Sequence, residues 1–319
     1  MKLIRQIEVY APDYLGKLDV LLAGNKIIAL EENITGGYSE LEVEEISGEG
    51  KLLTPGFIDC HFHILGGGGE GGFQNRTPEV TLSQLTSAGV TTVVGCLGTD
   101  GEGRDMTALI SKAKGLEAEG ITTFVYEGSY RLPVKTVTDS IIKDFLTIDK
   151  IIGIGEIAVS DHRSSQPTFE EFARATADAR VGGMLSGKAG IVNVHLGGGT
   201  RKLDLLKKVV EETEIPISQF LPTHANRTQE LLDACIEFAK NGGTIDFTAS
   251  EDPDFWEKTD GEVRFSKALK QLLDAGVALD NFTMTSDGQG SLPYFDENNH
   301  FIGMGVGLSL IHISEPTRH

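Results

Sequence analysis

The chain has 319 residues, 39% of them hydrophobic and 24% charged, which is typical of a globular protein with one large domain or two ordinary ones. Its net charge of -19 would repel a phosphate backbone, so we expect no nucleic acid partner and favour a cation or a substrate that carries an amine. The three cysteines are widely spaced, and neither a leader at Met1 nor an apolar run of about 18 residues stands out. We therefore expect a cytoplasmic protein with reduced thiols and no membrane partner.

The beginning of the chain has the pattern of a small β unit. Short β-type runs cover residues 3–10, 18–22 and 26–30, and Ala23-Gly24-Asn25 forms a hairpin turn between the last two. Residues 1–54 are therefore expected to form a separate, mostly β domain.

From Thr54 onward, strand, glycine-rich or polar loop, and helix alternate. The expected strands are 56–63, 91–99, 122–129, 153–160, 191–197, 220–225, 244–250 and 282–287. The expected helices are 81–88, 106–119, 169–180, 202–212, 228–241 and 263–275. Eight strands alternating with helices predict an α/β protein with a TIM-like (β/α)8 barrel over residues 55–308, and the chemistry of such barrels collects at the carboxyl ends of the strands.

Ionisable side chains stand at those strand ends. His61 and His63 lie one residue apart on the first strand, so both point to one face and could hold a metal ion. Two unconnected histidines at a strand end are the alternative for this pair alone. Later strand ends add Glu156, His195, His224 and Asp287. Four histidines and two carboxylates at one rim favour a metal site.

Several segments in the right order resemble one known family. Residues 55–63 are similar to the first metal motif of the amidohydrolase superfamily. More narrowly, residues 66–70, 76–80, 97–100, 160–164, 221–227 and 286–291 resemble bacterial β-aspartyl (isoaspartyl) dipeptidases. The similarity runs from about residue 18 to 307. The resemblance implies an amidohydrolase-type barrel preceded by residues 1–54, which would form part of a separate β-sandwich.

The resemblance implies two divalent metal ions, and nitrogen and oxygen ligands suggest zinc. The implied ligands are His61, His63, Glu156, His195, His224 and Asp287. The first-strand histidines and the aspartate would hold one ion, and the other two histidines the second. Many relatives bridge the ions with a carbamylated lysine, whereas here Glu156 would bridge them together with a hydroxide. Gly155 and Ile157 flank this glutamate, so its register stays open by one residue.

The resemblance also implies the catalytic residues. Asp287 would take a proton from the nucleophile and pass it to the departing amine, although it could be a plain metal ligand. Tyr130 would stabilise the oxyanion, although a tyrosine in a loop could serve only in packing.

The residues implied to bind substrate are Glu70, Thr99, Arg163, Arg227 and Ser291. Glu70 would bind a free α-amino group, and the two arginines would bind a carboxylate, although either arginine could be a surface ion-pair partner. His162 is interpreted as structural. A phosphate cradle at residues 66–72 is disfavoured because the lysine and the serine or threonine of a P-loop are missing.

The expected function is that of a metallo-dipeptidase that cleaves β-aspartyl dipeptides. A cyclic amidase of the dihydroorotase or hydantoinase type, an N-acyl amino acid deacylase, and an inactive metal- or peptide-binding chain are the alternatives. The resemblance implies that relatives continue beyond the eighth strand and assemble into homo-oligomers, so we expect a homo-oligomer when the chain has its full length. Residues 309–319 have the appearance of a non-native tail, so we expect an incomplete last helix, a missing part of the sandwich and uncovered apolar surface. The sequence does not indicate the metal, the leaving amino acid or the oligomeric state.

Overall fold

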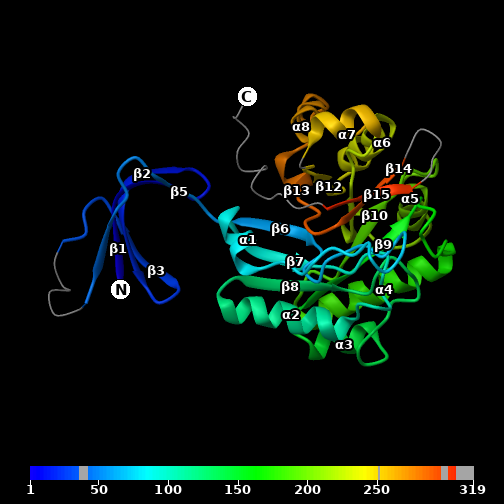
Figure 1. Cartoon of the computed structure of the whole chain (residues 1–319), viewed down its shortest axis with the longest axis horizontal. Helices are drawn as coiled ribbons and strands as arrows, with labels where there is room; N and C mark the ends of the chain where they lie inside the picture. Colours follow the sequence, from blue (N-terminus) through cyan, green and yellow to red (C-terminus); the bar gives the residue numbers. More distant parts are fainter. Residues whose placement is uncertain (36–41, 251, 296–300, 307–319) are drawn as a thin grey trace. The chain divides into compact units, whose positions relative to one another are not determined.

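The computed structural model describes residues 1–35, 42–250, 252–295 and 301–306 (Figure 1). Contacts divide the chain into two compact units, Met1–Phe57 and Ile58–His319. The expected non-native tail, residues 309–319, lies outside the described residues.

The first unit is a five-stranded sheet. Its strands are β1 (Lys2–Tyr10), β2 (Tyr14–Ala23), β3 (Lys26–Glu31), β4 (Glu44–Ser47) and β5 (Leu52–Leu53). They lie in the order β3-β2-β1-β4, with β5 paired to β1. Leu3 and Val20 are fully buried in its small apolar clusters. Asp19, also buried, accepts a hydrogen bond of 2.7 Å from Arg5 Nη1, which joins β1 to β2.

The second unit alternates strands and helices. Its strands are β6 (Phe57–Phe62), β7 (Val90–Gly95), β8 (Thr122–Glu127), β9 (Ile151–Val159), β10 (Ile191–Leu196), β11 (Phe220–Thr223), β12 (Ile245–Thr248) and β13 (Phe282–Thr285), followed by a hairpin of β14 (Ser291–Phe295) and β15 (Phe301–Val306). Its helices are α1 (Leu82–Ser87), α2 (Met106–Glu119), α3 (Ile141–Thr147), α4 (Phe169–Ser186), α5 (Asp204–Glu212), α6 (Gln229–Lys240), α7 (Pro253–Thr259) and α8 (Phe265–Asp274).

Strands β6 to β11 form one sheet in chain order, and β12 pairs with β13 in parallel. A buried aspartate on β12 links the two sheets, since Asp246 accepts hydrogen bonds from Thr223 on β11 and from Thr283 and Thr285 on β13 at 2.6–2.7 Å. On the other side, the His63 N–H after β6 donates to the Gly288 carbonyl after β13 at 2.9 Å. These contacts bring the carboxyl ends of the eight strands together, and the predicted α/β barrel class is confirmed.

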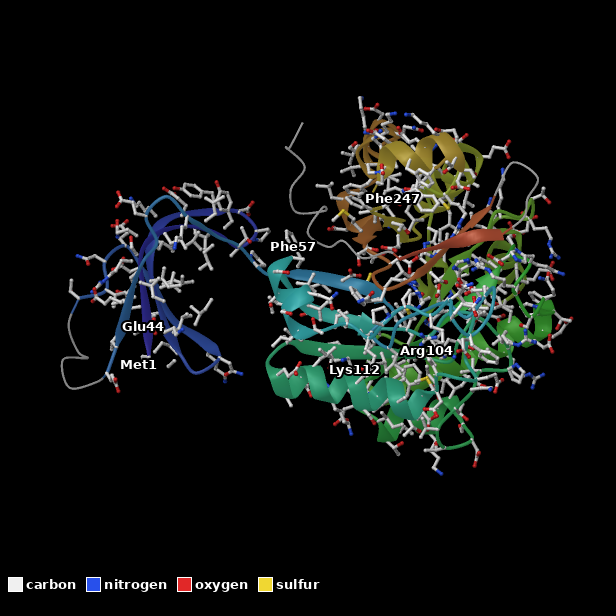
Figure 2. The ribbon with its side chains drawn as sticks, viewed as in Figure 1. Met1, Glu44, Phe57, Arg104, Lys112 and Phe247 are labelled. Carbon is white, nitrogen blue, oxygen red and sulfur yellow. The ribbon has the colours of Figure 1, made fainter. Side chains whose placement is uncertain are left out.

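The core lies between the strands and the helices outside them. Helix α2 runs along β8 and α3 packs against α4, whereas α6, α7 and α8 lie beside β12 and β13 (Figure 1). Phe247, labelled in Figure 2, is fully buried on β12 and contacts the rings of Phe265 on α8 and Phe282 on β13. Within the described part of the chain, no helix is both long and apolar enough to span a bilayer.

Helices α3 and α7 and the β14–β15 hairpin were not predicted from the sequence. Both helices are short and start at local caps, because the Ser140 side chain accepts from the Lys143 N–H and the Asp252 side chain from the Phe255 N–H. Pro253 at the first position of α7 is a further start signal. Short segments of this kind carry too few turns to show a helical period.

Candidate metal centre and substrate site

Glu156 on β9 lies among the histidines of three other elements. Its Oε2 is 3.3 Å from His61 Nε2, and its Oε1 is 3.3 Å from His63 Nε2. Oε2 is also 3.1 Å from His195 Nδ1 and 3.8 Å from His224 Nε2. Asp287 joins the first pair, with Oδ1 3.1 Å from His63 Nε2 and 3.5 Å from His61 Nε2. The structure therefore brings the six predicted metal ligands together.

These residues form two overlapping groups with the chemistry of metal ligands. One group contains His61, His63, Cys96 and Glu156, and the other contains Glu156, His195 and His224. Within each group the ligand atoms all lie within 4.8 Å of one another, and every member is buried. Because Glu156 belongs to both groups, its carboxylate connects them.

A divalent metal fits this arrangement. Among the described residues, Glu156 Oε1 and Asp287 Oδ1 are buried oxygens without a hydrogen-bond partner, a costly state that a bound cation would relieve. Nitrogen and oxygen ligands placed tetrahedrally at about 2.0–2.1 Å from zinc are about 3.3 Å apart. The distances from Glu156 to His61 and His63 match that separation.

A register shift in β9 points the Glu156 side chain toward the histidines. The pairing of β9 with β10 slips between Ile154 and Ile157, as in a β-bulge. Gly155 has φ +143°, and a Cβ there would lie 2.6 Å from the Asn193 carbonyl oxygen, so only glycine fits. Ile157 is buried in the apolar core. Of the three residues considered for the bridging position, only Glu156 faces the site.

Further backbone and side-chain contacts hold the ligands in place. His224 and Asp287 both have left-handed φ values, +61° and +49°, a strain that is concentrated at functional sites. His61 Nδ1 donates to Asn193 Oδ1 at 3.0 Å, and His224 Nδ1 lies 2.7 Å from Thr248 Oγ1. Each contact leaves Nε2 directed toward Glu156, as expected for a metal ligand held by a second hydrogen bond.

Protonation within the cluster follows from burial and mutual charge. Burial by itself raises the pKa of Glu156 and Asp287, but the neighbouring histidines outweigh it and hold both pKa values well below the usual range. Burial lowers the pKa of His224 to about 3. For His61 and His63, neighbouring negative groups outweigh burial and raise the pKa. A metal ion would compete with those two protons.

Tyr130 lies in the loop after β8, at the His195 side of the cluster. Its hydroxyl is 2.9 Å from His195 Nδ1, and the Arg163 guanidinium lies 5.2 Å from the centre of its ring. Burial raises the pKa of Tyr130 well above 10, so the hydroxyl keeps its proton and can act as a donor.

The predicted contacts for a substrate amine gather around Glu70. Thr99 Oγ1 donates to Glu70 Oε1 at 2.6 Å, and Ser291 Oγ donates to Glu70 Oε2 at 3.3 Å. Arg163 Nη1 forms an ion pair of 3.1 Å with Glu70 Oε1. Burial by itself raises the pKa of Glu70, but the Thr99 hydroxyl and Arg163 outweigh it and hold the pKa below its ordinary value.

Two glycines allow the loop before Glu70 to fold tightly. Gly66 and Gly68 have φ values of +77° and +82°, and a Cβ on either would lie within 2.4 Å of a backbone carbonyl oxygen. Arg104, labelled in Figure 2, lies just before the start of α2 and donates from Nε to the Leu65 carbonyl at 3.1 Å, which fastens this loop. The loop thereby holds Glu70 beside the barrel strands.

Asp161 is a site residue that the sequence analysis missed. Its Oδ2 is 3.1 Å from His195 Nε2 and accepts from Arg163 Nη2 at 2.8 Å. Asp161 therefore links His195, a predicted metal ligand, to Arg163, a predicted substrate-binding residue. Arg227 donates from Nε to the Leu196 carbonyl at 3.0 Å, and among the described hydrogen bonds and ion pairs it makes none with Glu70. The side chain of His162 is 86% exposed and takes no part in the cluster.

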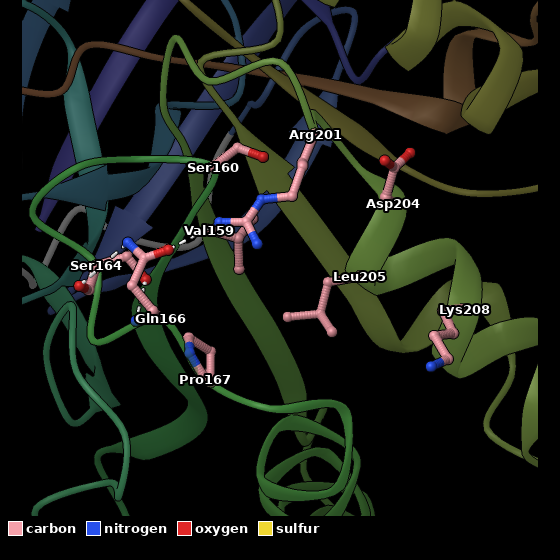
Figure 3. A pocket seen from close by; sticks show the side chains of 9 residues that line it. All are labelled: Val159, Ser160, Ser164, Gln166, Pro167, Arg201, Asp204, Leu205 and Lys208. Carbon is pink, nitrogen blue, oxygen red and sulfur yellow. Dashed lines mark hydrogen bonds between the residues drawn. The ribbon is translucent and has the colours of Figure 1, made fainter.

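A separate pocket of about 220 Å³ lies between the end of β9 and the start of α5 (Figure 3). Ser164, Pro167 and Leu205 are among its lining residues, and Arg201 Nη2 donates to Gln166 Oε1 at 2.8 Å within it. Of the described side chains, those predicted for the site do not line this pocket.

Part of the chain is similar in sequence to curated proteins of known name. No protein-family model matches the chain. It is 27% identical over 124 residues to imidazolonepropionase of Yersinia pseudotuberculosis, a match that covers 37% of this chain and 29% of that relative. It is 32% identical over 93 residues to dihydroorotase of Staphylococcus epidermidis, covering 29% of this chain and 21% of that relative. The matched segment thus spans less than a third of either curated relative.

Solved structures give longer matches. The β-aspartyl dipeptidase of Fervidobacterium islandicum AW-1, in complex with a β-Asp-Leu dipeptide, is 51% identical with a TM-score of 0.89, covering 97% of this chain and 78% of that one. A D-hydantoinase from Bacillus sp. AR9 is 18% identical with a TM-score of 0.57, covering 91% of this chain and 69% of that one, and so shares the fold. The chain belongs to the β-aspartyl dipeptidase family of the amidohydrolase superfamily.

Proposed function

We propose that this chain hydrolyses the isopeptide bond of β-aspartyl dipeptides with two divalent metal ions, zinc being the expected metal. The main support for this proposal is the Glu70–Arg163 ion pair, which lies beside the candidate metal ligands around Glu156. It is supported by 51% identity to an enzyme whose structure contains a β-Asp-Leu dipeptide.

The metal ions would be held by the residues described above. His61, His63 and Asp287 would bind one, His195 and His224 the other, and the Glu156 carboxylate would bind both. When bound, such ions lower the pKa of a water molecule toward neutrality and polarise a carbonyl group.

Asp287 is suited to move the proton. Its low pKa keeps the carboxylate ionised at neutral pH, so it can accept a proton from the attacking water. As the C–N bond breaks, the same carboxyl group would deliver that proton to the departing amine. Water thus adds across the amide bond, and Asp287 ends the cycle ionised, as it began.

Tyr130 is suited to stabilise the oxygen of the scissile carbonyl. Its buried hydroxyl remains protonated and lies at the edge of the cluster, next to His195. A neutral donor held in place there would strengthen its hydrogen bond as negative charge develops on that oxygen.

The Glu70–Arg163 pair suits the free end of a β-aspartyl peptide. In such a peptide the aspartyl residue carries its α-amino and α-carboxylate groups side by side, since the amide is formed by the side chain. The ammonium group would bind Glu70 and the carboxylate Arg163, replacing one ion pair by two. Thr99 and Ser291 would keep Glu70 oriented while the pair opens.

A substrate panel on the metal-loaded chain tests this proposal. We expect turnover of β-Asp-Leu, about two metal ions per chain, and loss of hydrolysis in Asp287→Ala. Turnover of dihydroorotate, hydantoins or N-acyl amino acids with no cleavage of β-Asp-Leu would contradict the proposal and favour a cyclic amidase or deacylase.

A further inference from the structure

Cys96 directly follows β7 and is buried against the two histidines of β6. Its Sγ is 3.8 Å from His61 Nε2 and 3.8 Å from His63 Nδ1, and the residue has no exposed surface. The Cys96 N–H donates to the carbonyl of Phe62, the residue between the two histidines, at 2.9 Å. The backbone therefore fixes the sulfur at the inner edge of the cluster.

The other two cysteines have different surroundings. Cys60, on β6, packs at the edge of the small apolar cluster that contains Cys96, and its Sγ lies 3.7 Å from Thr283 Oγ1. Cys235, on α6, is fully buried in the main apolar core. Among the described thiols, Cys96 alone belongs to a group with the composition of a metal site.

The distances around Cys96 suit a shared metal ion. With a metal–sulfur bond of about 2.3 Å and a metal–nitrogen bond of about 2.0–2.1 Å, tetrahedral geometry separates sulfur from nitrogen by about 3.6 Å. The observed separation from His61 Nε2 is 3.8 Å. His61 Nδ1 is already bonded to Asn193, so its Nε2, the atom near the sulfur, is the one available to a metal.

We propose that the Cys96 thiolate is a direct ligand of the metal ion held by His61 and His63. This deepens the metal site of the proposed function and rests on that site binding metal. A thiolate makes this position softer than one built of nitrogen and oxygen alone, which favours zinc, cobalt and cadmium over magnesium and manganese. The alternative is a thiol that only packs against the His63 ring.

Cobalt loading of the full chain distinguishes the two roles without an activity assay. We expect the Co²⁺ protein to show a near-ultraviolet sulfur-to-cobalt charge-transfer absorption that is lost in Cys96→Ser and kept in Cys60→Ser, the matched control on the neighbouring strand β6. We also expect the dissociation constant for Cd²⁺ to rise at least about tenfold in Cys96→Ser, with a smaller change for Mn²⁺.

The wild-type spectrum alone can overturn the assignment, so it remains testable if the serine variant does not fold. Visible d–d bands of bound cobalt without a charge-transfer band would show that the sulfur is not a ligand. A cobalt protein that has the charge-transfer band yet leaves β-Asp-Leu intact would contradict the proposed function and support the Cys96 assignment.

Discussion

Replacing Glu127 by glutamine should stabilise this chain increasingly as the pH rises. Glu127 ends β8 and has no exposed surface, and both its carboxylate oxygens lack a hydrogen-bond partner within the described structure. Burial, followed by the neighbouring Asp144, raises the pKa of Glu127 to about 10. Burial by itself also raises the pKa of Asp144, but the neighbouring Glu127 and Thr138 and the backbone N–H groups of Val137 and Thr138 outweigh it and lower that pKa. Glu127 is thus protonated in the folded chain at neutral pH.

The sign and size of the effect follow from linkage. In the unfolded chain a glutamic acid ionises near pH 4.3–4.5, whereas the folded chain keeps the Glu127 proton up to a pKa of about 10. The stability that this proton confers is complete below the unfolded pKa and is lost as the pH rises through the folded pKa. Between pH 6 and pH 8 the loss is about 1.4 kcal/mol per pH unit, or about 2.7 kcal/mol in total. Glutamine is neutral at every pH, so it adds no such pH dependence to the free energy of unfolding.

Urea unfolding followed by circular dichroism at pH 6, 7 and 8, with equal metal content, measures the difference in unfolding free energy between Glu127→Gln and wild type. We expect this difference to shift in favour of the variant by about 2.7 kcal/mol across the range. Glu119→Gln, at an exposed position on α2, is the matched control and should show a constant difference. If the difference in unfolding free energy between Glu127→Gln and wild type does not change with pH, Glu127 is not protonated in the folded chain.

Three further substitutions test the site. Tyr130→Phe should lower kcat/KM for β-Asp-Leu by about 10²–10³-fold with unchanged metal content, and an unaltered kcat would contradict its role at the carbonyl oxygen. Glu70→Gln should weaken turnover of β-Asp-Leu far more than turnover of succinyl-leucine, which lacks the α-amino group; an equal loss on both would argue against an amine subsite. Asp161→Asn should raise KM for β-Asp-Leu, because Arg163 loses a charged partner. The same substitution should weaken metal binding at His195 by about 10–100-fold. A metal titration that shows unchanged affinity would limit the role of Asp161 to substrate binding.

Much of the barrel was predictable because its strands are apolar runs bounded by glycines and polar loops. Helix α2 covers Met106–Glu119, the range expected from its pattern. Helix α4 continues past the predicted end at residue 180 to Ser186, since Gly182 and Gly183 are tolerated where they pack closely against Phe145 and Gly190. Glycine lowers helix propensity, so the sequence pattern does not indicate this extension.

The site was predictable where a titratable side chain interrupts an apolar strand end, as His195 and Glu156 do. Cys96 was missed because it lies in an apolar run, where a thiol resembles any small core residue. Asp161 was missed because its function depends on contacts with His195, which is distant in sequence. The bulge that aims Glu156 could not be located from the sequence, because strand register depends on the neighbouring strand.

The most direct test of the account compares kcat/KM for β-Asp-Leu and α-Asp-Leu, two isomers of the same composition, on the chain loaded with metal. Only the β isomer places an α-amino group and an α-carboxylate on one carbon, opposite Glu70 and Arg163. The account predicts cleavage of the β isomer and none of the α isomer. Equal cleavage of both, or cleavage of neither by chain that holds two metal ions, would contradict it.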